Sequence, residues 1–192
     1  MNTDIFFQKI KSYTDLTAES EKAWLDILKE KAYNKGDYFI QIGQVPRKFG
    51  FVCKGLFSQY YITDKGDTVI KYFFPEGRIA GSVPATLTKK ESLFTIEAIE
   101  QSTVLEYDFN EFKRLVAAYR DVAEFYIRYM EQHWVIEKEP LEVVLRTDTA
   151  ARRYNDFLLK YPTVVKRLKK HHIAAYLGIT PTQLSRVFLI NK

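Results

Sequence analysis

The sequence has almost no cysteine and no long uncharged stretch. Its 192 residues include one cysteine, Cys53, which cannot form a disulfide within the chain or hold zinc or an iron–sulfur cluster by itself. The longest run without Asp, Glu, Lys or Arg, from His171 to Ser185, is too short and too polar to span a bilayer. The first residues lack the apolar core of a secretion signal. These absences predict a cytoplasmic protein that has no membrane span, metal or other cofactor.

Glycine is scarce outside one region, because seven of the eight glycines fall between Gly36 and Gly81. Turns at this spacing, between segments rich in Tyr, Phe, Val and Ile, are typical of short antiparallel strands. We expect a hairpin turn at 64–67, in which Gly66 takes a positive φ. The expected strands are YFIQI, FGFVCKG, LFSQYYITDKGDTVIKYFF, TIEAIE and TVLEYD. Many short strands with no helix between them indicate a β sandwich or barrel that ends near residue 109.

Charge is distributed unevenly along the chain. The net charge is +5, but the segment from Arg146 to Lys192 has ten basic residues and two acidic ones, so it carries +8 and the rest carries −3. Such asymmetry indicates a module that binds a polyanion, with nucleic acid the first candidate and an anionic membrane the second. A solvated basic surface that binds nothing is the alternative.

Helical patterns flank the strands. Thr17 can cap a helix before them, and Asn110 can cap a long helix after them. The apolar residues of the long helix recur at alternating spacings of four and three, which is the pattern of a coiled-coil seam. We therefore expect homodimerisation through residues 110–146, with Pro140 producing a hinge near Glu139. The expected contact residues are Leu115, Tyr119, Val122, Tyr126 and Tyr129.

A second apolar row on the long helix leaves an alternative open, in which the helix packs on its own β domain. Both arrangements can hold at once, with one face on the β domain and the other on a partner chain. This second row consists of Phe112, Val116, Phe125, Met130 and Trp134.

The most specific pattern in the basic segment is KHHIAAYLGITPTQLSRVFLI. A further helix precedes it, capped by Thr147 or Thr149 and stopped by Pro162. Within the pattern, a small residue at Ala174, a glycine at Gly178 and apolar residues at fixed offsets meet every requirement of a helix-turn-helix. The core positions are Ile173, Leu177, Ile179, Leu184 and Val187. An ordinary helical hairpin is the alternative.

The second helix of this pattern has side chains suited to reading base edges. Thr180 can cap it, with Pro181 at its first position. Gln pairs with adenine, Arg with guanine, and Ser or Thr with several base edges. Lys169 and Lys170 can meet phosphates at the start of the first helix, as can Arg167. The predicted DNA-binding residues are Lys169, Lys170, Thr180, Thr182, Gln183, Ser185 and Arg186.

The order of parts resembles the Crp/Fnr family of bacterial transcription regulators over nearly the whole chain. The sharpest matches are KGDYFIQIGQ, FVCKGLFSQYYITDKGDTVIKYFFPEG and HHIAAYLGITPTQLSR. The resemblance implies an α+β fold: an antiparallel double-stranded β-helix (jelly roll) sensor domain at 1–109, a dimerisation helix and hinge at 110–146, and a helix-turn-helix domain at 147–192. It also implies a homodimer on a roughly palindromic double-stranded DNA operator, and RNA polymerase as a further partner.

Departures from the family pattern bear on the effector. Members that bind cyclic nucleotides have a Gly-Glu pair for the ribose and an Arg-Ser pair for the phosphate; the matching positions here are Gly81-Ser82 and Ser92-Leu93. Without the arginine an anionic phosphate would be buried unpaired, so we do not expect cyclic AMP to bind. Arg78, Lys89 or Lys90 could substitute from a neighbouring turn. By position in the family pattern, the expected effector pocket consists of Arg78, Gly81, Ser82, Val83, Ser92 and Leu93.

Two other classes of function remain for comparison. A small-ligand-binding β roll whose basic segment serves only for assembly would not prefer any DNA sequence. An enzyme on a cupin-like roll is disfavoured, because all three histidines (His133, His171 and His172) lie outside the strands. No nucleophile with its base and no cluster of metal ligands is evident, so we do not expect an enzyme.

Overall fold

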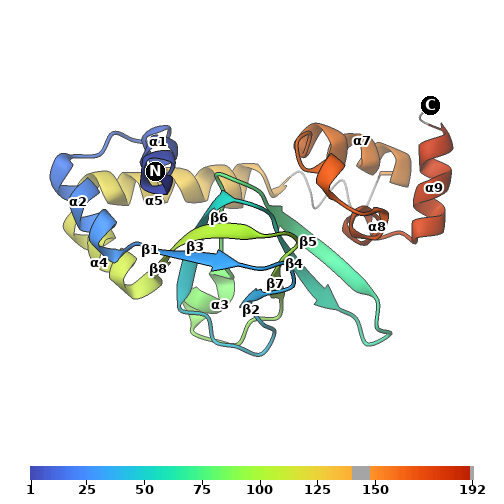
Figure 1. The fold of residues 1–192 in the computed structure, drawn as a ribbon, viewed down its shortest axis with the longest axis horizontal. Helices are drawn as coiled ribbons and strands as arrows, with labels where there is room; N and C mark the ends of the chain where they lie inside the picture. Colours follow the sequence, from blue (N-terminus) through green and yellow to red (C-terminus); the bar gives the residue numbers. More distant parts are fainter. Residues whose placement is uncertain (140–147, 191–192) are drawn as a thin grey trace.

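The computed structural model describes residues 1–139 and 148–190, and at its centre is a β roll made of two four-stranded antiparallel sheets (Figure 1). One sheet has the strand order β1-β8-β3-β6 and the other β2-β7-β4-β5. The strands are β1 (Lys29–Tyr33), β2 (Tyr38–Ile40), β3 (Lys48–Lys54), β4 (Phe57–Ile62), β5 (Thr68–Phe74), β6 (Ile79–Ala80), β7 (Thr95–Ala98) and β8 (Ser102–Asp108). Every segment expected to form a strand does so, which confirms the antiparallel β domain.

The sheets enclose an apolar core because alternate side chains of each strand face the opposite sheet. In the centre of the β3–β8 pairing, Val52 lies opposite Val104, and both side chains are fully buried. The core between the sheets consists of Tyr33, Phe39, Ile40, Val52, Phe57, Phe74, Ala80, Ile96, Ala98 and Val104.

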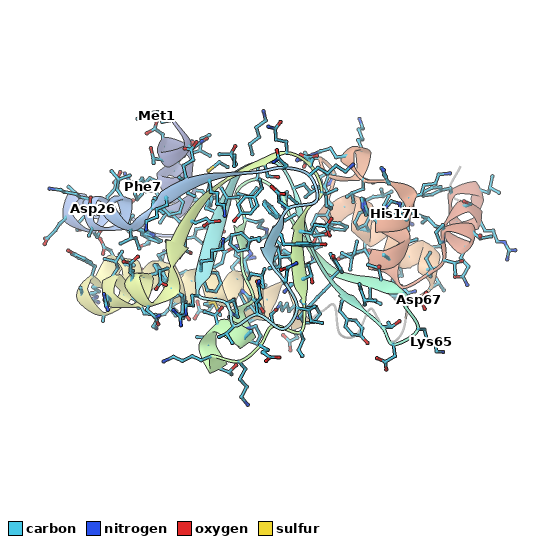
Figure 2. The ribbon with its side chains drawn as sticks, turned by 60° about the horizontal axis from the view of Figure 1, so that its bottom comes forward. Met1, Phe7, Asp26, Lys65, Asp67 and His171 are labelled. Atoms are coloured by element: carbon cyan, nitrogen blue, oxygen red, sulfur yellow. The ribbon has the colours of Figure 1, made fainter. Side chains whose placement is uncertain are left out.

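Strands β4 and β5 form a long hairpin that extends beyond the rest of the roll (Figure 1). Ile62 pairs with Thr68, and the Thr63 amide donates to the Asp67 carbonyl at 2.9 Å. Gly66 has φ +84°, which confirms the expected turn and its need for a glycine. Lys65 and Asp67 mark the hairpin tip in Figure 2, and Asp67 lines the same groove as His171.

A short helix, α3 (Val83–Thr88), lies between β6 and β7. The expectation that no helix separates the strands was therefore wrong. Proline in its first turn favours helical φ, and Lys89 ends the helix in the left-handed region at φ 54°.

Helices α1 (Asn2–Lys11) and α2 (Ala18–Ile27) cover one end of the roll (Figure 1). Phe6 and Trp24 are completely buried there, with ring centroids 5.3 Å apart. Thr17 caps α2 as expected, because its hydroxyl accepts from the Ser20 amide at 3.3 Å.

The segment after the strands is not one continuous α-helix. It consists of α4 (Phe109–Ala118), α5 (Arg120–Met130) and a π-helical turn η1 (Glu131–Ile136). Tyr119 separates α4 from α5 in an extended conformation, with φ −121° and ψ 121°. The cap of α4 is Asp108 and not Asn110, since the Asp108 carboxylate accepts from the Asn110 amide at 2.7 Å. The expected seam of three heptads is therefore broken at Tyr119. The expected hinge at Pro140 lies outside the described residues.

Residues 148–190 form a helical unit, here called the C-terminal module. Its elements are α7 (Ala150–Lys160), the 3-10 turn η2 (Val165–Arg167), α8 (Lys170–Leu177) and α9 (Pro181–Ile190). Thr149 caps α7 by accepting from the Arg152 amide at 3.3 Å, whereas the alternative cap, Thr147, lies outside the described residues.

The C-terminal module shares a hydrophobic core with the roll. Phe73 of β5 is completely buried, with its ring centroid 5.5 Å from that of Tyr176 and 5.7 Å from that of Tyr161. Leu56 and Ile99 of the roll belong to the same core. A fully buried phenylalanine contributes about 1.5–3 kcal/mol relative to an exposed one, so these contacts dock the module firmly on the roll. No helix in the described part of the chain is long and apolar enough to cross a membrane.

Candidate nucleic-acid interface

Helices α8 and α9 are joined by a tight turn at Gly178. This glycine has φ 66° and ψ 34°, and the amide of the next residue, Ile179, donates to the Ala174 carbonyl at 3.0 Å. Ala174 is 1% exposed, and its small side chain lets the two helices approach closely. The buried residues of the two helices, at the positions that the sequence spacing predicts, are Ile173, Ala174, Leu177, Leu184 and Val187.

Thr180 and Gln183 form a reciprocal cap at the start of α9. The Thr180 hydroxyl accepts from the Gln183 amide at 3.2 Å, and the Gln183 side-chain oxygen accepts from the Thr180 amide at 2.8 Å. A capping box of this kind satisfies two otherwise unpaired amides. Gln183 therefore has to leave the cap before it can pair bidentately with an adenine.

The predicted DNA-binding residues are almost all on the surface. Ser185 is the exception, since it is half-buried and its hydroxyl donates to the Pro181 carbonyl at 3.0 Å. Within the described residues, no ion pair engages Arg186. The exposed residues are Lys169, Lys170, Thr180, Thr182, Gln183 and Arg186.

A groove of about 770 Å³ separates the C-terminal module from the β4–β5 hairpin. Its basic residues come from both sides: Lys35 from the roll, and Lys169 and His172 from the module. Burial and the neighbouring cations lower the pKa of His172 to about 4, so this imidazole is neutral at pH 7. The positive charge of the groove therefore comes from its lysines and not from His172.

The residues assigned to an effector pocket differ widely in exposure. Ser82 and Ser92 are 3% and 1% exposed, and the Ser92 hydroxyl donates to the Ser82 hydroxyl at 3.1 Å. Val83 belongs to the hydrophobic core, and Leu93 is 71% exposed. A side chain at Gly81 would overlap the Phe49 ring.

Arg78 is committed to other partners. Its guanidinium donates to Glu137 Oε2 at 2.7 Å and also contacts the His133 ring, both beyond the end of α5. The residues at the cyclic-nucleotide positions therefore do not fit an anionic phosphate: the hydroxyls are satisfied by each other, and the one arginine in the set already has a carboxylate partner.

The dimerisation residues predicted from the heptad pattern mostly pack inside this chain. Val122 is 0% exposed, and Tyr129 packs on the same core, where its hydroxyl accepts from the Ile79 amide at 3.2 Å. Val122 is therefore enclosed by the hydrophobic core of its own chain, and its side chain is not exposed to a partner chain. Leu115, Tyr119 and Tyr126 are half-buried against this core. The exposed large apolar residues of the α5–η1 segment are Ile127, Val135 and Ile136.

One contact of functional interest was not predicted. Arg167, considered only for phosphate binding, is bound by Glu76 and Glu100 of the roll. These carboxylates lie 91 and 67 residues away in the sequence, so no local pattern could have indicated them. No group of three or more potential metal ligands occurs in the described residues.

Comparison with known proteins agrees with this geometry. Residues 30–119 match the family model of the cyclic nucleotide-binding domain. The β roll has the cyclic nucleotide-binding fold. In this chain the fold has serine and leucine at the positions where the nucleotide's ribose and phosphate partners were expected, as described above. No curated protein matches the sequence.

Several solved structures are similar in fold to most of this chain. The c-di-GMP-responsive global regulator CLP of Xanthomonas campestris is similar with a TM-score of 0.70 and 13% identity, over 89% of this chain and 89% of that chain. FixK2 of Bradyrhizobium japonicum has a TM-score of 0.70 and 19% identity, over 84% of this chain and 83% of its own. The catabolite activator protein of Thermus thermophilus has a TM-score of 0.57 and 17% identity, over 91% and 83%. The chain is thus structurally similar to Crp/Fnr-type regulators.

Proposed function

We propose that the protein is a homodimeric, sequence-specific DNA-binding transcription regulator of the Crp/Fnr type. The observation that carries the proposal is the α8–α9 unit: a left-handed Gly178 joins the two helices, and Thr182 and Arg186 are exposed on the second one. In this proposal α8 and α9 form a helix-turn-helix, and α9 is the recognition helix that enters the major groove.

Two classes of contact have separate roles. Lys169 and Lys170, at the start of α8, supply charge for phosphates and so provide affinity that depends on salt. Thr182 and Arg186 face outward from α9 and read base edges, with guanine the partner that suits arginine. Gln183 reads a base after it exchanges its cap for the DNA, and Ser185 contributes less because it is already bonded within the helix.

Dimerisation is proposed along the outer face of α5 and η1. This face exposes Ile127, Val135 and Ile136, at 55%, 57% and 59%, whereas the opposite face packs on the roll. The effector of the sensor domain is proposed not to be cyclic AMP, because Ser82 and Ser92 are occupied by each other.

Selection of bound sequences from a random DNA pool tests this function. A regulator of this type selects a roughly palindromic sequence whose half-sites are about 34 Å apart, one turn of the duplex. A small-ligand-binding roll without DNA-binding activity would select nothing above background. This alternative is not favoured, since the solved structures that match over most of the chain include Crp/Fnr-type regulators.

A further inference from the structure

The side chain of Arg167 joins the C-terminal module to two turns of the roll. Its Nη1 donates to Glu76 Oε2 at 2.9 Å and its Nη2 donates to Glu76 Oε1 at 2.9 Å, a bidentate pair. Its Nε donates to Glu100 Oε2 at 3.3 Å, and its Nη2 also contacts Glu100 Oε1. One guanidinium thus binds all four oxygens of two carboxylates, a geometry that the point charge of a lysine cannot reproduce. We call this arrangement of Arg167, Glu76 and Glu100 the fork.

Hydrogen bonds within the roll hold the Glu76 carboxylate and the backbone of the turn that carries Glu100. Glu76 Oε1 accepts from the Gly55 amide at 2.9 Å. The Ser102 hydroxyl donates to the Glu100 carbonyl at 2.8 Å and accepts from the Leu56 amide at 3.2 Å. Burial alone would raise the pKa of Glu76, but the hydrogen bonds from Arg167 and from backbone amides, together with the charge of Arg167, lower it. The Glu76 carboxylate is therefore charged at neutral pH.

Arg167 is placed to set the direction of the recognition helix. It ends η2, and α8 begins three residues later at Lys170. Arg167 adds directional hydrogen bonds to the apolar docking contact, in which Leu56 and Ile99 of the roll share one hydrophobic cluster with Val164 of the module. In this docked arrangement Arg186 is exposed, so the docking presents the reading face and does not cover it.

We propose that Arg167, held by Glu76 and Glu100, is a positioning residue that orients the C-terminal module on the roll for operator binding. This inference rests on the proposed DNA-binding function. A dimer gains from its second half-site only if the two recognition helices are already held at the spacing of the operator. Releasing the fork leaves each module able to read a half-site but removes the fixed spacing.

The same turn also reaches the long helical segment. Glu76 holds the module, and Arg78, two residues later, holds Glu137 beyond α5. The β5–β6 turn is thus the element through which the roll fixes both the module and the proposed dimerisation segment.

The test uses variants that leave Lys169, Lys170 and the residues of α9 unchanged. Glu76→Gln/Glu100→Gln removes both charges from the fork, and Arg167→Lys keeps the positive charge but loses the fork geometry. The control is Glu30→Gln/Glu91→Gln, which changes the net charge equally at two exposed carboxylates of the roll. The DNA probes are the operator obtained by selection, a single half-site, and the operator with its half-sites moved apart by half a turn.

Positioning predicts a particular pattern of binding. The preference for the full operator over the half-site falls about tenfold or more in both fork variants, while half-site affinity stays within about twofold of the control. Discrimination against the misspaced operator falls as well. If both fork variants keep the full-site preference of the control, the proposal is wrong. If their affinity for the half-site falls as much as their affinity for the full operator, Arg167 has a general structural role, and the positioning role is also wrong.

A second measurement does not depend on DNA. Spin labels at Asp26→Cys on α2 and Leu159→Cys on α7 report the distance between roll and module; both sites are exposed, while Cys53 is buried and has a pKa raised to about 11. The distance distribution should broaden in the fork variants and not in the control. An unchanged distribution overturns the positioning role even if DNA binding is established. If the parent selects no DNA sequence, the proposed function fails, and a broadened distribution still shows that the fork holds the module.

Discussion

Arg78 and Glu137 form an ion pair of 2.7 Å between the β5–β6 turn and the end of the long helical segment. The other Glu137 oxygen accepts from His133 Nδ1 at 2.7 Å, and the Tyr13 hydroxyl contacts His133 Nε2 at 2.6 Å. Parts of the chain that are far apart in sequence, from the turn after α1, the roll and η1, therefore meet at one polar cluster. This cluster connects the proposed sensor with the proposed dimerisation segment.

The Arg78–Glu137 ion pair should make the free energy of unfolding decrease at acid pH. Burial alone would raise the pKa of Glu137, but hydrogen bonds from His133 and Arg78 lower it from 4.5 to about 2. A carboxyl with a depressed folded pKa stabilises the fold above its unfolded pKa, and the contribution is lost as the pH falls from about 4.5 to about 2. We expect a loss of roughly 2–3 kcal/mol over this range. Denaturant unfolding at several pH values should show it, and Glu137→Gln should flatten this part of the profile. An equally steep profile in that variant would assign the acid sensitivity to other carboxyls.

Arg186→Ala should weaken binding to the selected operator by roughly 1–3 kcal/mol, because a bidentate contact to one base pair is removed. Selection with the variant should show relaxed preference at one position of each half-site. Arg120→Ala, an exposed arginine on the long helical segment, is the control. Equal affinity of parent and Arg186→Ala across a salt titration would show that α9 is not the recognition helix.

Lys169→Ala and Lys170→Ala should act differently from Arg186→Ala. Each removes an exposed cation beside the proposed phosphate path, so each should weaken binding to all sequences alike and reduce the salt slope by about one unit. Fluorescence anisotropy between low and moderate salt measures both quantities. A change in base preference with an unaltered salt slope would contradict the assignment of these lysines to phosphates.

Cyclic AMP at millimolar concentration should not raise the melting temperature. The hydroxyls of Ser82 and Ser92 are bonded to each other, and Arg78 is paired with Glu137. Binding to the folded state would stabilise it by mass action, so thermal unfolding with and without nucleotide is a direct measurement. A saturable rise would overturn the effector assignment and implicate Arg78, Lys89 or Lys90 as the phosphate partner.

Ile127→Glu should shift the protein from dimer to monomer, because it places a charge in the centre of the proposed apolar interface. Sedimentation velocity measures the mass, and circular dichroism should show unchanged secondary structure. Ile62→Glu is a matched control, since Ile62 is similarly exposed at 54% but lies on the β4–β5 hairpin. A dimer that survives Ile127→Glu would place the interface elsewhere.

The strands and the α8–α9 unit were predictable because local rules govern them. Gly66 marks the hairpin, Thr17 and Thr149 cap their helices, and Gly178 ends α8 in the left-handed region. Each signal acts over a few residues, so the sequence pattern carries it directly. The short helix α3 and the strands β1 and β6 were missed, because short elements carry weak local signals.

The faces of the long helical segment were not predictable in the same way. The apolar spacing around Val122 fits packing on a partner chain and packing within its own chain equally well, and the structure buries Val122 in the core of its own chain. Just after the break at Tyr119, the Asp121 carboxylate accepts from the Val122 amide at 2.8 Å. It also accepts from the Ser20 hydroxyl at 2.6 Å and the Thr17 amide at 2.7 Å, at the start of α2. A heptad count does not contain these long-range contacts.

The sequence by itself determined the antiparallel roll, the basic C-terminal segment and the helix pair with its exposed Arg186, since turn chemistry, charge and hydrophobic spacing are local properties. Only the tertiary structure decided that Ser82 and Ser92 satisfy each other, that Arg78 is committed to Glu137, and that Arg167 joins Glu76 and Glu100. The physical reason is that a charged or polar side chain takes the partner that the fold brings within hydrogen-bond distance, and residue type alone does not specify which partner that is.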